Sequence, residues 1–160
     1  MKFIADGMLG KLSRWLRMLG YDVKYTNKLD DNNLTITARK ERRILLTRDL
    51  ELYQQATAKG VEAFYVRGEN EAERLAEIAE HFGISLSINL ENSRCPKCNT
   101  KLCGIQKEEV KDKVEKNTYV HYEKFWSCPK CSQIYWQGAH WSNIQSTLKT
   151  AKEKFKEKID

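Results

Sequence analysis

The stretch Ile44-Leu45-Leu46-Thr47-Arg48-Asp49 contains the most strand-like run of the chain, because its first four residues are β-branched or leucine. Further candidate strands lie at residues 2–5, 23–26 and 63–66. A segment with helical periodicity follows each run after a short connection. This alternation of strand and helix predicts a parallel sheet covered by helices on both faces.

The expected helices have recognisable ends. In the first, leucines recur at helical spacing, and Gly20 lies where a C-cap is expected. Asp30, Asp31 and Asn32 offer N-cap chemistry to the second. The four helices are expected at residues 9–19, 30–42, 50–59 and 71–82.

The composition excludes several classes of protein. Hydrophobic residues make up 41% of the 160 and charged residues 31%, as in soluble globular proteins. No apolar run approaches the roughly 18 residues of a membrane span, and the N-terminus lacks the apolar stretch of a signal peptide. Gly7, Gly10 and Gly20 fit neither a dinucleotide fingerprint nor a Walker motif. We therefore expect a cytoplasmic protein with no membrane contact and no nucleotide cofactor.

The chain changes character after its first half. Residues 1–88 are expected to form the α/β domain, residues 89–141 a cysteine-containing module, and residues 142–160 a basic amphipathic helix. Residues 1–93 hold 14 basic and 14 acidic side chains, so the entire net charge of +6 lies in the remainder. Such a basic module indicates a polyanionic partner, although lysines kept for solubility would give the same charge.

Two identical Cys-Pro-Lys-Cys turns predict a metal site. Two residues between the cysteines let both sulfurs face one point, at Zn–S distances near ~2.3 Å. Disulfides and redox pairs are the alternatives, but disulfides are rare in cytosolic proteins and a redox motif would be a single pair. The 29 residues between the turns predict an extended hairpin or an insertion, and Cys103 is left as a free thiol. The expected ligands of one closed, structural zinc ion are Cys95, Cys98, Cys128 and Cys131.

Aspartates follow three of the expected strands. Asp6 comes directly after the first, Asp30 and Asp31 after the second, and Asp49 directly after the third. Because parallel strands end at one edge of the sheet, these carboxylates are expected to lie near one another. Such clusters suit Mg²⁺ or Mn²⁺, which can promote phosphodiester displacement. N-capping of the following helix is the alternative for Asp31 and Asp49.

Basic side chains lie next to the first of these aspartates. Lys11, Arg14 and Arg17 follow one another at intervals of three, so they line one flank of the first helix. That flank could hold a nucleic-acid backbone close to the acidic cluster. Solvated charge or ion pairing is the alternative, and Arg48 fits either role.

Aromatic side chains gather at the end of the cysteine module, at Trp136, His140 and Trp141. They could stack unpaired bases. Packing of the small module against its neighbour is the favoured interpretation, because aromatic rings supply core area.

In these residues the chain resembles the Mut-seven C-terminal ribonuclease domain family, in which a PIN-like nuclease fold is fused to a zinc ribbon. The resemblance is specific because an Arg-Trp-Leu-Arg helix and a Gly-x-His-Trp ending occur in this order. The matching segments are residues 3–22, 30–31, 45–49, 93–99, 128–131 and 135–141.

The resemblance implies an α/β fold with a PIN-like parallel sheet flanked by helices, followed by a four-cysteine zinc ribbon and a C-terminal helix. It implies metal-dependent hydrolysis of RNA, with Asp6, Asp31 and Asp49 as ligands of Mg²⁺ or Mn²⁺ and Asp30 as a substitute for Asp31. The wider PIN group has a fourth acid after the fourth strand. Here the nearest candidate is Glu69, which could equally be loop surface.

The leading interpretation is therefore a Mg²⁺- or Mn²⁺-dependent ribonuclease whose basic ribbon and C-terminal helix bind RNA. The alternatives are a non-catalytic RNA-binding adaptor and a protein-interaction module with the same fold. The adaptor would bind RNA in a strongly salt-dependent way without any need for Mn²⁺ or Asp6.

Overall fold

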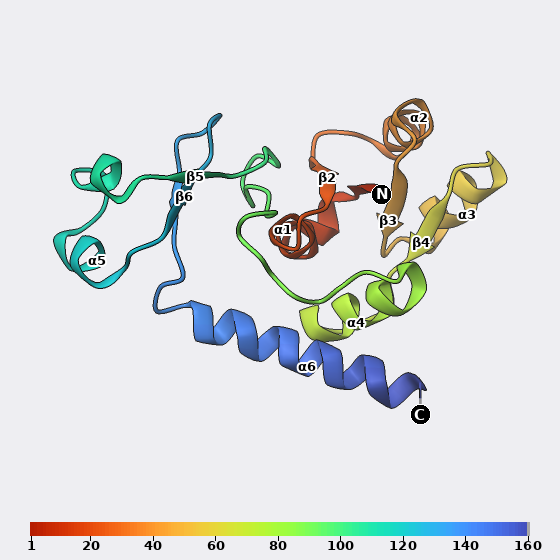
Figure 1. Cartoon of the computed structure of the whole chain (residues 1–160). Helices are drawn as coiled ribbons and strands as arrows, with labels where there is room; N and C mark the ends of the chain where they lie inside the picture. Colours follow the sequence, from red (N-terminus) through yellow and green to blue (C-terminus); the bar gives the residue numbers. More distant parts are fainter. Residues whose placement is uncertain (160) are drawn as a thin grey trace.

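The computed structural model describes the backbone of residues 1–159 and the side-chain surroundings of residues 1–156. Its first part is a parallel sheet in the order β2-β1-β3-β4 (Figure 1). The expected strands are confirmed to within one residue at each end. They are β1 (Lys2–Ala5), β2 (Asp22–Tyr25), β3 (Ile44–Thr47) and β4 (Ala63–Tyr65).

The helices of this part have clear caps, among them Asp30, Asp49 and Gly20, which the sequence predicts. The side chains of Asp30, Asp49 and Asn70 each accept backbone N–H groups at a helix N-terminus. Gly20 and Gly83 adopt positive φ just after a helix, a conformation that glycine takes without steric cost. The elements are η1 (Gly7–Leu9), α1 (Gly10–Met18), α2 (Asp31–Glu41), α3 (Leu50–Ala58) and α4 (Glu71–Phe82).

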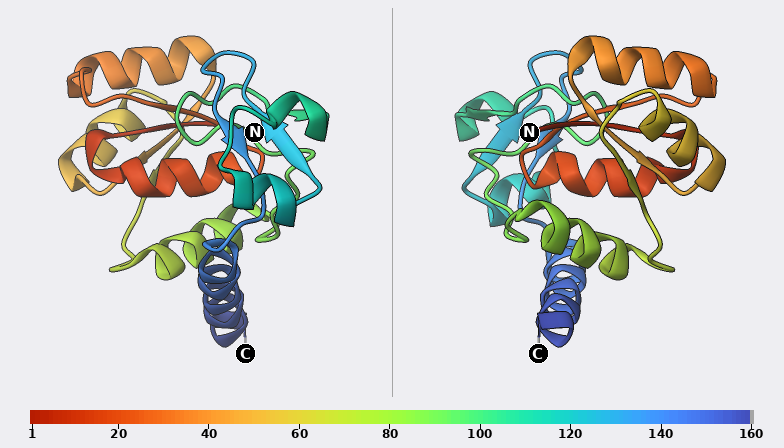
Figure 2. Two further views of the ribbon diagram at one scale, coloured as in Figure 1. Left: turned by 90° about the vertical axis from the view of Figure 1, so that its left-hand side faces the viewer. Right: turned by 90° about the vertical axis from the view of Figure 1, so that its right-hand side faces the viewer.

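The helices cover both faces of the sheet (Figure 2). Because side chains alternate along a strand, Phe3 and Ala5 of β1 pack with α1 and α4, while Ile4 packs with α2 and α3. β3 does the same with Leu45 and Leu46, which belong to the two different cores. The sheet is thus buried on both sides, and its two ends are the places where functional side chains can reach solvent.

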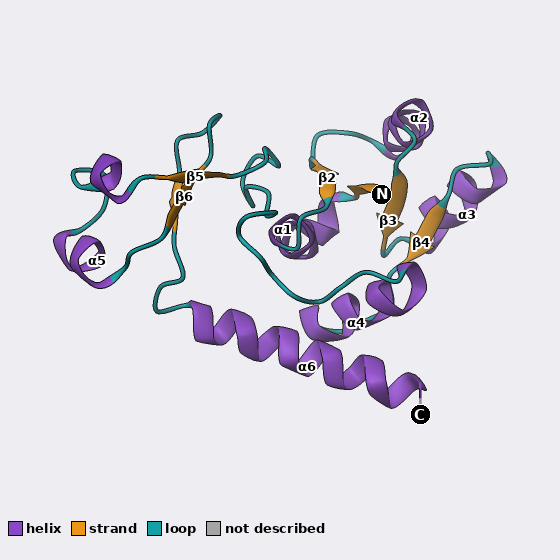
Figure 3. Cartoon of the chain, viewed as in Figure 1, coloured by secondary structure: helices purple, strands orange, loops and turns teal. Residues whose placement is uncertain are grey.

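The cysteine module is a small antiparallel sheet with long loops (Figure 3). Its strands are β5 (Cys103–Ile105), β6 (Phe125–Ser127) and β7 (Ile134–Tyr135). The long spacing between the cysteine pairs is an insertion between β5 and β6, not a long hairpin. This insertion contains η2 (Lys107–Val110) and α5 (Lys116–His121).

The last helix, α6 (Trp141–Ile159), runs along α4 (Figure 1). Leu148 and Ala151 are buried there, with Ile144 and Phe155 packed beside them, so the predicted apolar stripe is the contact face. Lys154 also approaches Glu73 of α4 at 3.8 Å. α6 therefore shares the core of the α/β part, although the division into three domains stays a prediction. None of the described helices is long and apolar enough to cross a membrane.

Trp136 and Trp141 pack in cores of the cysteine module itself, and not between the module and the α/β part as the favoured interpretation expects. The ring of Trp136 lies 6.2 Å from that of Phe125, and Trp141 packs against the core that contains Cys95. His140 is exposed. These rings enlarge cores that would otherwise be very small.

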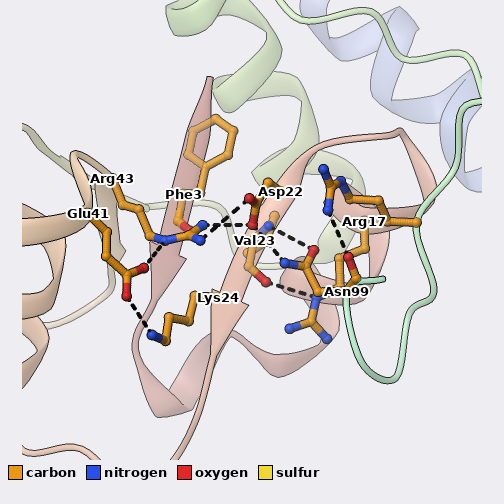
Figure 4. Close-up of polar contacts among 9 residues, drawn as sticks. Phe3, Arg17, Asp22, Val23, Lys24, Glu41, Arg43 and Asn99 are labelled. Carbon is orange, nitrogen blue, oxygen red and sulfur yellow. Dashed lines mark hydrogen bonds and ion pairs between the residues drawn. The ribbon is translucent and has the colours of Figure 1, made fainter. Parts of the chain in front are cut away.

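The module is joined to the sheet at Val23, in the edge strand β2 (Figure 4). The Val23 N–H donates to Asn99 Oδ1 at 3.0 Å, and the Val23 carbonyl accepts from Arg17 Nε at 2.9 Å. Arg17 also donates to the Pro96 carbonyl at 2.8 Å. Edge strands expose unpaired backbone groups, and here the module and α1 together satisfy those of Val23.

An ionic network continues from this joint across the strands (Figure 4). Asn99 Nδ2 donates to Asp22 Oδ1 at 2.7 Å, and Arg43 pairs with the same oxygen at 2.8 Å. Arg43 also pairs with Glu41 at 2.6 Å, and Glu41 with Lys24 at 2.8 Å. Burial acts against ionisation of Asp22, but hydrogen bonds from Arg43 and Asn99 outweigh it and lower the pKa of Asp22 below 3.8.

We predict that Asn99→Gly destabilises the protein by about 1–3 kcal/mol, because Val23 N–H loses its buried acceptor. Asn99 adopts a φ of 70°, which glycine accepts readily, so backbone strain does not contribute to the loss. Ser132 occupies the matching position of the second turn, at a φ of 63°. Ser132→Gly is therefore the control and should not destabilise. Urea unfolding measures both, and an Asn99→Gly variant as stable as wild type would contradict the joint.

We also predict a pH-dependent effect of Asp22→Asn. Since the folded chain lowers the pKa of Asp22, its carboxylate stabilises the fold above about pH 4, and the contribution is lost as the pH falls through the folded pKa. The variant should be less stable than wild type at neutral pH, and the difference should shrink at about pH 3. Urea unfolding at both pH values measures it, with the exposed Asp112→Asn as control. An equal deficit at both pH values would contradict this assignment.

Candidate active site and metal centre

The two cysteine turns have the same backbone geometry. In the first, Cys95 N–H donates to the Thr100 carbonyl at 2.8 Å, and Asn99 N–H donates to the Cys95 carbonyl at 2.8 Å. In the second, the corresponding bonds join Cys128 to Gln133 at 3.0 Å and Ser132 to Cys128 at 2.9 Å. Each turn therefore presents its two sulfurs on the same side.

The four sulfurs meet at one point. Their Sγ atoms all lie within 4.8 Å of one another, with Cys95 and Cys131 at 3.6 Å and Cys98 and Cys128 at 3.3 Å. Zn–S bonds of about 2.3 Å in a tetrahedron require S–S separations of about 3.8 Å. All five cysteines are free thiols, and Cys103 is exposed and outside the cluster. The cluster could hold a metal ion such as zinc.

The surroundings of the cluster act on its thiols in opposite directions. Burial raises the pKa of Cys128 to about 12, whereas hydrogen bonds to Thr100 overcome burial and lower that of Cys98 to about 6. Four thiolates cannot stay together in a buried place unless a positive charge compensates them. Burial lowers the pKa of Arg17, and the sulfurs of Cys95 and Cys98 act in the opposite direction. Arg17 thus places a positive charge beside the cluster.

Asp6 is the buried member of the acidic residues, with 6% of its surface exposed. Its Oδ1 accepts the Met8 N–H at 2.9 Å, and its Oδ2 accepts the Arg48 N–H at 3.3 Å and the Thr47 hydroxyl. The carboxylate therefore joins the ends of β1 and β3. A serine or threonine N-cap could not accept all three bonds, because its single oxygen has two lone pairs.

Thr47 is a residue that the sequence analysis missed. Its hydroxyl donates to Asp6 Oδ2 and accepts the Asp49 N–H at 2.9 Å, so it positions two of the candidate catalytic aspartates. It is completely buried. A threonine at the end of a leucine-rich strand, two residues before an aspartate, was the available signal.

The remaining aspartates divide between capping and exposed positions. Asp49 Oδ1 caps α3 by accepting the Glu51 N–H at 2.9 Å. The cap of α2 is Asp30, which accepts the Asn33 N–H at 2.8 Å, so the capping alternative applies to Asp30 and not to Asp31. Asp31 is exposed in the first turn of α2.

Electrostatic coupling links these carboxylates. Partial loss of solvent, followed by the charges of Asp49, Asp6 and Asp30, raises the pKa of Asp31 above its ordinary value. In residues 1–156, the aspartates do not form a group with ligand atoms as close as those of the four cysteines. Mutual repulsion explains the separation, because carboxylates approach closely only around a cation or a shared proton. Their oxygen donors fit Mg²⁺ or Mn²⁺.

The basic residues of α1 differ in exposure. Lys11 and Arg14 are exposed, as phosphate contacts require. Arg17 does not fit its predicted role in RNA binding: it is 6% exposed, and two backbone carbonyls occupy its guanidinium. The interval of three placed it on the flank of Lys11 and Arg14, but the sequence did not reveal the module that covers it. Arg48 is half-buried and donates to the Gly68 carbonyl.

Glu69, the nearest candidate for a fourth acid, is exposed in the loop after β4. Its N–H donates to the Glu73 carboxylate at 2.7 Å, so the backbone of this loop is fixed at the start of α4. Glu69 is thus a surface residue of this loop.

Comparison with known proteins identifies the family of the chain. Neither curated proteins nor solved structures gave a match. The family model described as the Mut7-C RNAse domain matches residues 1–148, which include every aspartate and cysteine of the two sites. This match points to a ribonuclease-like enzyme with RNA as its substrate. The chain belongs to the Mut7-C RNAse domain family.

Proposed function

We propose that this protein is a Mg²⁺- or Mn²⁺-dependent ribonuclease that hydrolyses RNA phosphodiester bonds at Asp6, Asp31 and Asp49. What supports the proposal is that Asp6 and Asp49 follow the ends of β1 and β3 and Asp31 begins α2, and that the charges of Asp49 and Asp6 act on Asp31. Family membership supports the same reaction class. Asp30, which caps α2, is the weaker candidate for a ligand.

Each residue has a part in this proposal. Asp6, Asp31 and Asp49 would hold the cation, and Thr47 would keep Asp6 and Asp49 in position through its hydroxyl. When bound, Mg²⁺ or Mn²⁺ supplies Lewis-acid stabilisation of the phosphoryl oxygens and lowers the pKa of water. Lys11 and Arg14 are exposed beyond η1 and would bind RNA phosphates by charge.

Binding of the rest of the RNA is assigned to the basic part of the chain. Residues 94–160 hold 14 basic and 8 acidic side chains, and the exposed face of α6 includes Lys149, Lys152 and Lys156. Phosphate contacts of this kind make affinity fall steeply with salt. The zinc ion that we assign to the four cysteines would hold this module together, because four thiolates leave no open coordination position for chemistry.

Replacing a catalytic aspartate should abolish most cleavage. We predict that Asp6→Asn and Asp31→Asn each lower the rate on single-stranded RNA with Mn²⁺ by about 100-fold or more, since metal stabilisation contributes several kcal/mol. Asp30→Asn should cost less, and the exposed Glu62→Gln at the opposite end of the sheet serves as the control. The rate of RNA cleavage under single-turnover conditions is the measurement.

Two results would contradict the assignment. Wild-type protein that is pure and folded but cleaves no RNA would favour the adaptor, provided that it binds RNA without dependence on Mn²⁺. Variants of Asp6 and Asp31 that cleave as fast as wild type would place the chemistry elsewhere.

Metal analysis tests the cysteine cluster separately. We predict one zinc per chain in wild type and its loss in Cys98→Ser and Cys128→Ser, together with a lower unfolding temperature, because the metal supplies folding free energy. Cys103→Ser is the matched control, since Cys103 is exposed and outside the cluster. Equal zinc content in all four proteins would show that the cluster is not the binding site.

A further inference from the structure

The two edges of the sheet have different surroundings. On β2, Asn99 and Arg17 occupy the outer N–H and carbonyl of Val23. Within residues 1–159, β4 pairs only with β3. The bonds from Leu45 N–H to the Glu62 carbonyl and from Val66 N–H to the Thr47 carbonyl show which residues face β3. Strand alternation therefore directs the backbone groups of Ala63 and Tyr65 to the outer side.

A groove of about 640 Å³ lies along this outer side, between α3 and α4. Its wall includes Tyr53 of α3, Tyr65 at the end of β4, and Arg67 in the following loop. The two tyrosine rings lie 6.1 Å apart at 40°, and the Arg67 guanidinium lies 5.7 Å from the centre of the Tyr65 ring. Arg67 is exposed, and both tyrosines are half-buried.

In residues 1–156, the rings of Tyr53 and Tyr65 are not part of the hydrophobic core on either face of the sheet. Among the described residues, Tyr21 and Tyr25 pack against the core on one face, but neither Tyr53 nor Tyr65 packs against the core of either face. Core packing therefore gives no reason for two adjacent tyrosines here. A flat ligand that stacks on them is a reason that their geometry supports.

Tyr53 and Tyr65 lie near the end of the sheet that carries the aspartates. Tyr53 N–H donates to the Asp49 carbonyl at 3.0 Å, so its ring begins one turn along α3, about 6 Å from Asp49 along the axis. Tyr65 is the register partner of Thr47, whose hydroxyl donates to Asp6. Two strand spacings, or about 10 Å, therefore separate the end of β4 from the end of β1. A single-stranded RNA bound at the carboxylates can therefore reach the two tyrosine rings with its neighbouring nucleotides.

Two acidic residues line the groove, Glu77 and the exposed Glu80, and the charge of Glu77 is compensated. Glu77 accepts the N–H groups of Arg67 at 2.7 Å and Gly68 at 2.6 Å, so backbone donors compensate its charge and hold the loop. The same bonds fix the backbone from which Arg67 projects. Arginine beside an aromatic ring suits nucleic acids, because it can stack on a base or bind a phosphate.

We propose that Tyr53, Tyr65 and Arg67 form a base-stacking subsite that binds one or two unpaired bases of the RNA next to the cleavage site. This inference rests on the proposed ribonuclease function. It adds the path that the RNA strand takes as it leaves the carboxylates. Stacking on aromatic rings accepts every base, so the subsite selects single-stranded RNA over duplex RNA without a strong sequence preference.

The test is equilibrium binding of a fluorescent single-stranded RNA to the full chain, without Mg²⁺ or Mn²⁺, so that no cleavage interferes. Tyr53→Ala and Tyr65→Ala should each weaken binding by about 5- to 140-fold, the value of one stacked base. Tyr53→Phe and Tyr65→Phe should bind like wild type. Gln54→Ala, an exposed neighbour on α3, is the matched control and should also be neutral.

A second arm uses RNA with abasic nucleotides in place of the bases nearest the cleavage site. Wild type should bind the abasic RNA more weakly than the intact RNA. The Tyr65→Ala variant should bind the two RNAs with nearly the same affinity. If an alanine variant does not fold, Tyr→Leu against Tyr→Phe makes the same comparison, since leucine fills space without an aromatic face. Folding is checked by the unfolding temperature of each variant.

The outcomes separate the two proposals. Folded alanine or leucine variants whose RNA dissociation constant lies within about twofold of that of wild type would overturn the subsite, even if wild type cleaves RNA. The β4 edge would then be left as a surface for a peptide strand. Phenylalanine variants as weak as alanine variants would overturn it as well. A wild-type protein that neither binds nor cleaves RNA would overturn the proposed function together with the subsite that rests on it.

Discussion

The attachment of the cysteine module to the sheet depends on the backbone of Val23. Asn99 accepts its N–H and Arg17 donates to its carbonyl, and Arg17 also binds Pro96 in the first cysteine turn. A buried guanidinium is tolerated only when acceptors and negative charge surround it. Here they come from β2 and from the cysteine cluster, so the two parts of the chain require one another. α6 makes a second connection by returning from the module to pack on α4.

This attachment leaves the functional surfaces at the other end and the other edge of the sheet. The carboxylates lie at the carboxyl ends of the strands, whereas Arg43 bridges Asp22 and the Phe3 carbonyl near the start of β1. One end of the sheet is thus fixed by ion pairs, and the other carries negative charge that a cation would neutralise. Since the module covers the β2 edge, an RNA strand that leaves the carboxylates has the β4 side open to it.

Much of this fold follows from local sequence signals. The strand at Ile44–Thr47, the capping aspartates and the glycines after α1 and α4 each act within a few residues, so the sequence predicts the elements and their order closely. The cysteine cluster was equally accessible, because two short turns with fixed spacing leave few geometries. Proximity of the aspartates followed from the rule that ligands lie at the carboxyl ends of parallel strands.

Other features depend on contacts between distant residues. Spacing on α1 placed Arg17 with Lys11 and Arg14, but only the docking of residues 94–99 turns it into a buried joint. The sequence indicates only that Thr47 belongs to a strand, whereas the structure shows its hydroxyl hydrogen-bonded to Asp6 and Asp49. Tyr53 and Tyr65 are twelve residues apart, and only the pairing of β3 with β4 brings them together.

The central claim is that Asp6, Asp31 and Asp49 hold a divalent cation, and anomalous diffraction from a Mn²⁺-soaked crystal tests it most directly. We expect a manganese peak at about 2.2 Å from oxygens of these carboxylates, with the side chains closer together than in the present structure. A crystal with manganese only at the four cysteines or at lattice contacts, and none between these aspartates, would contradict it.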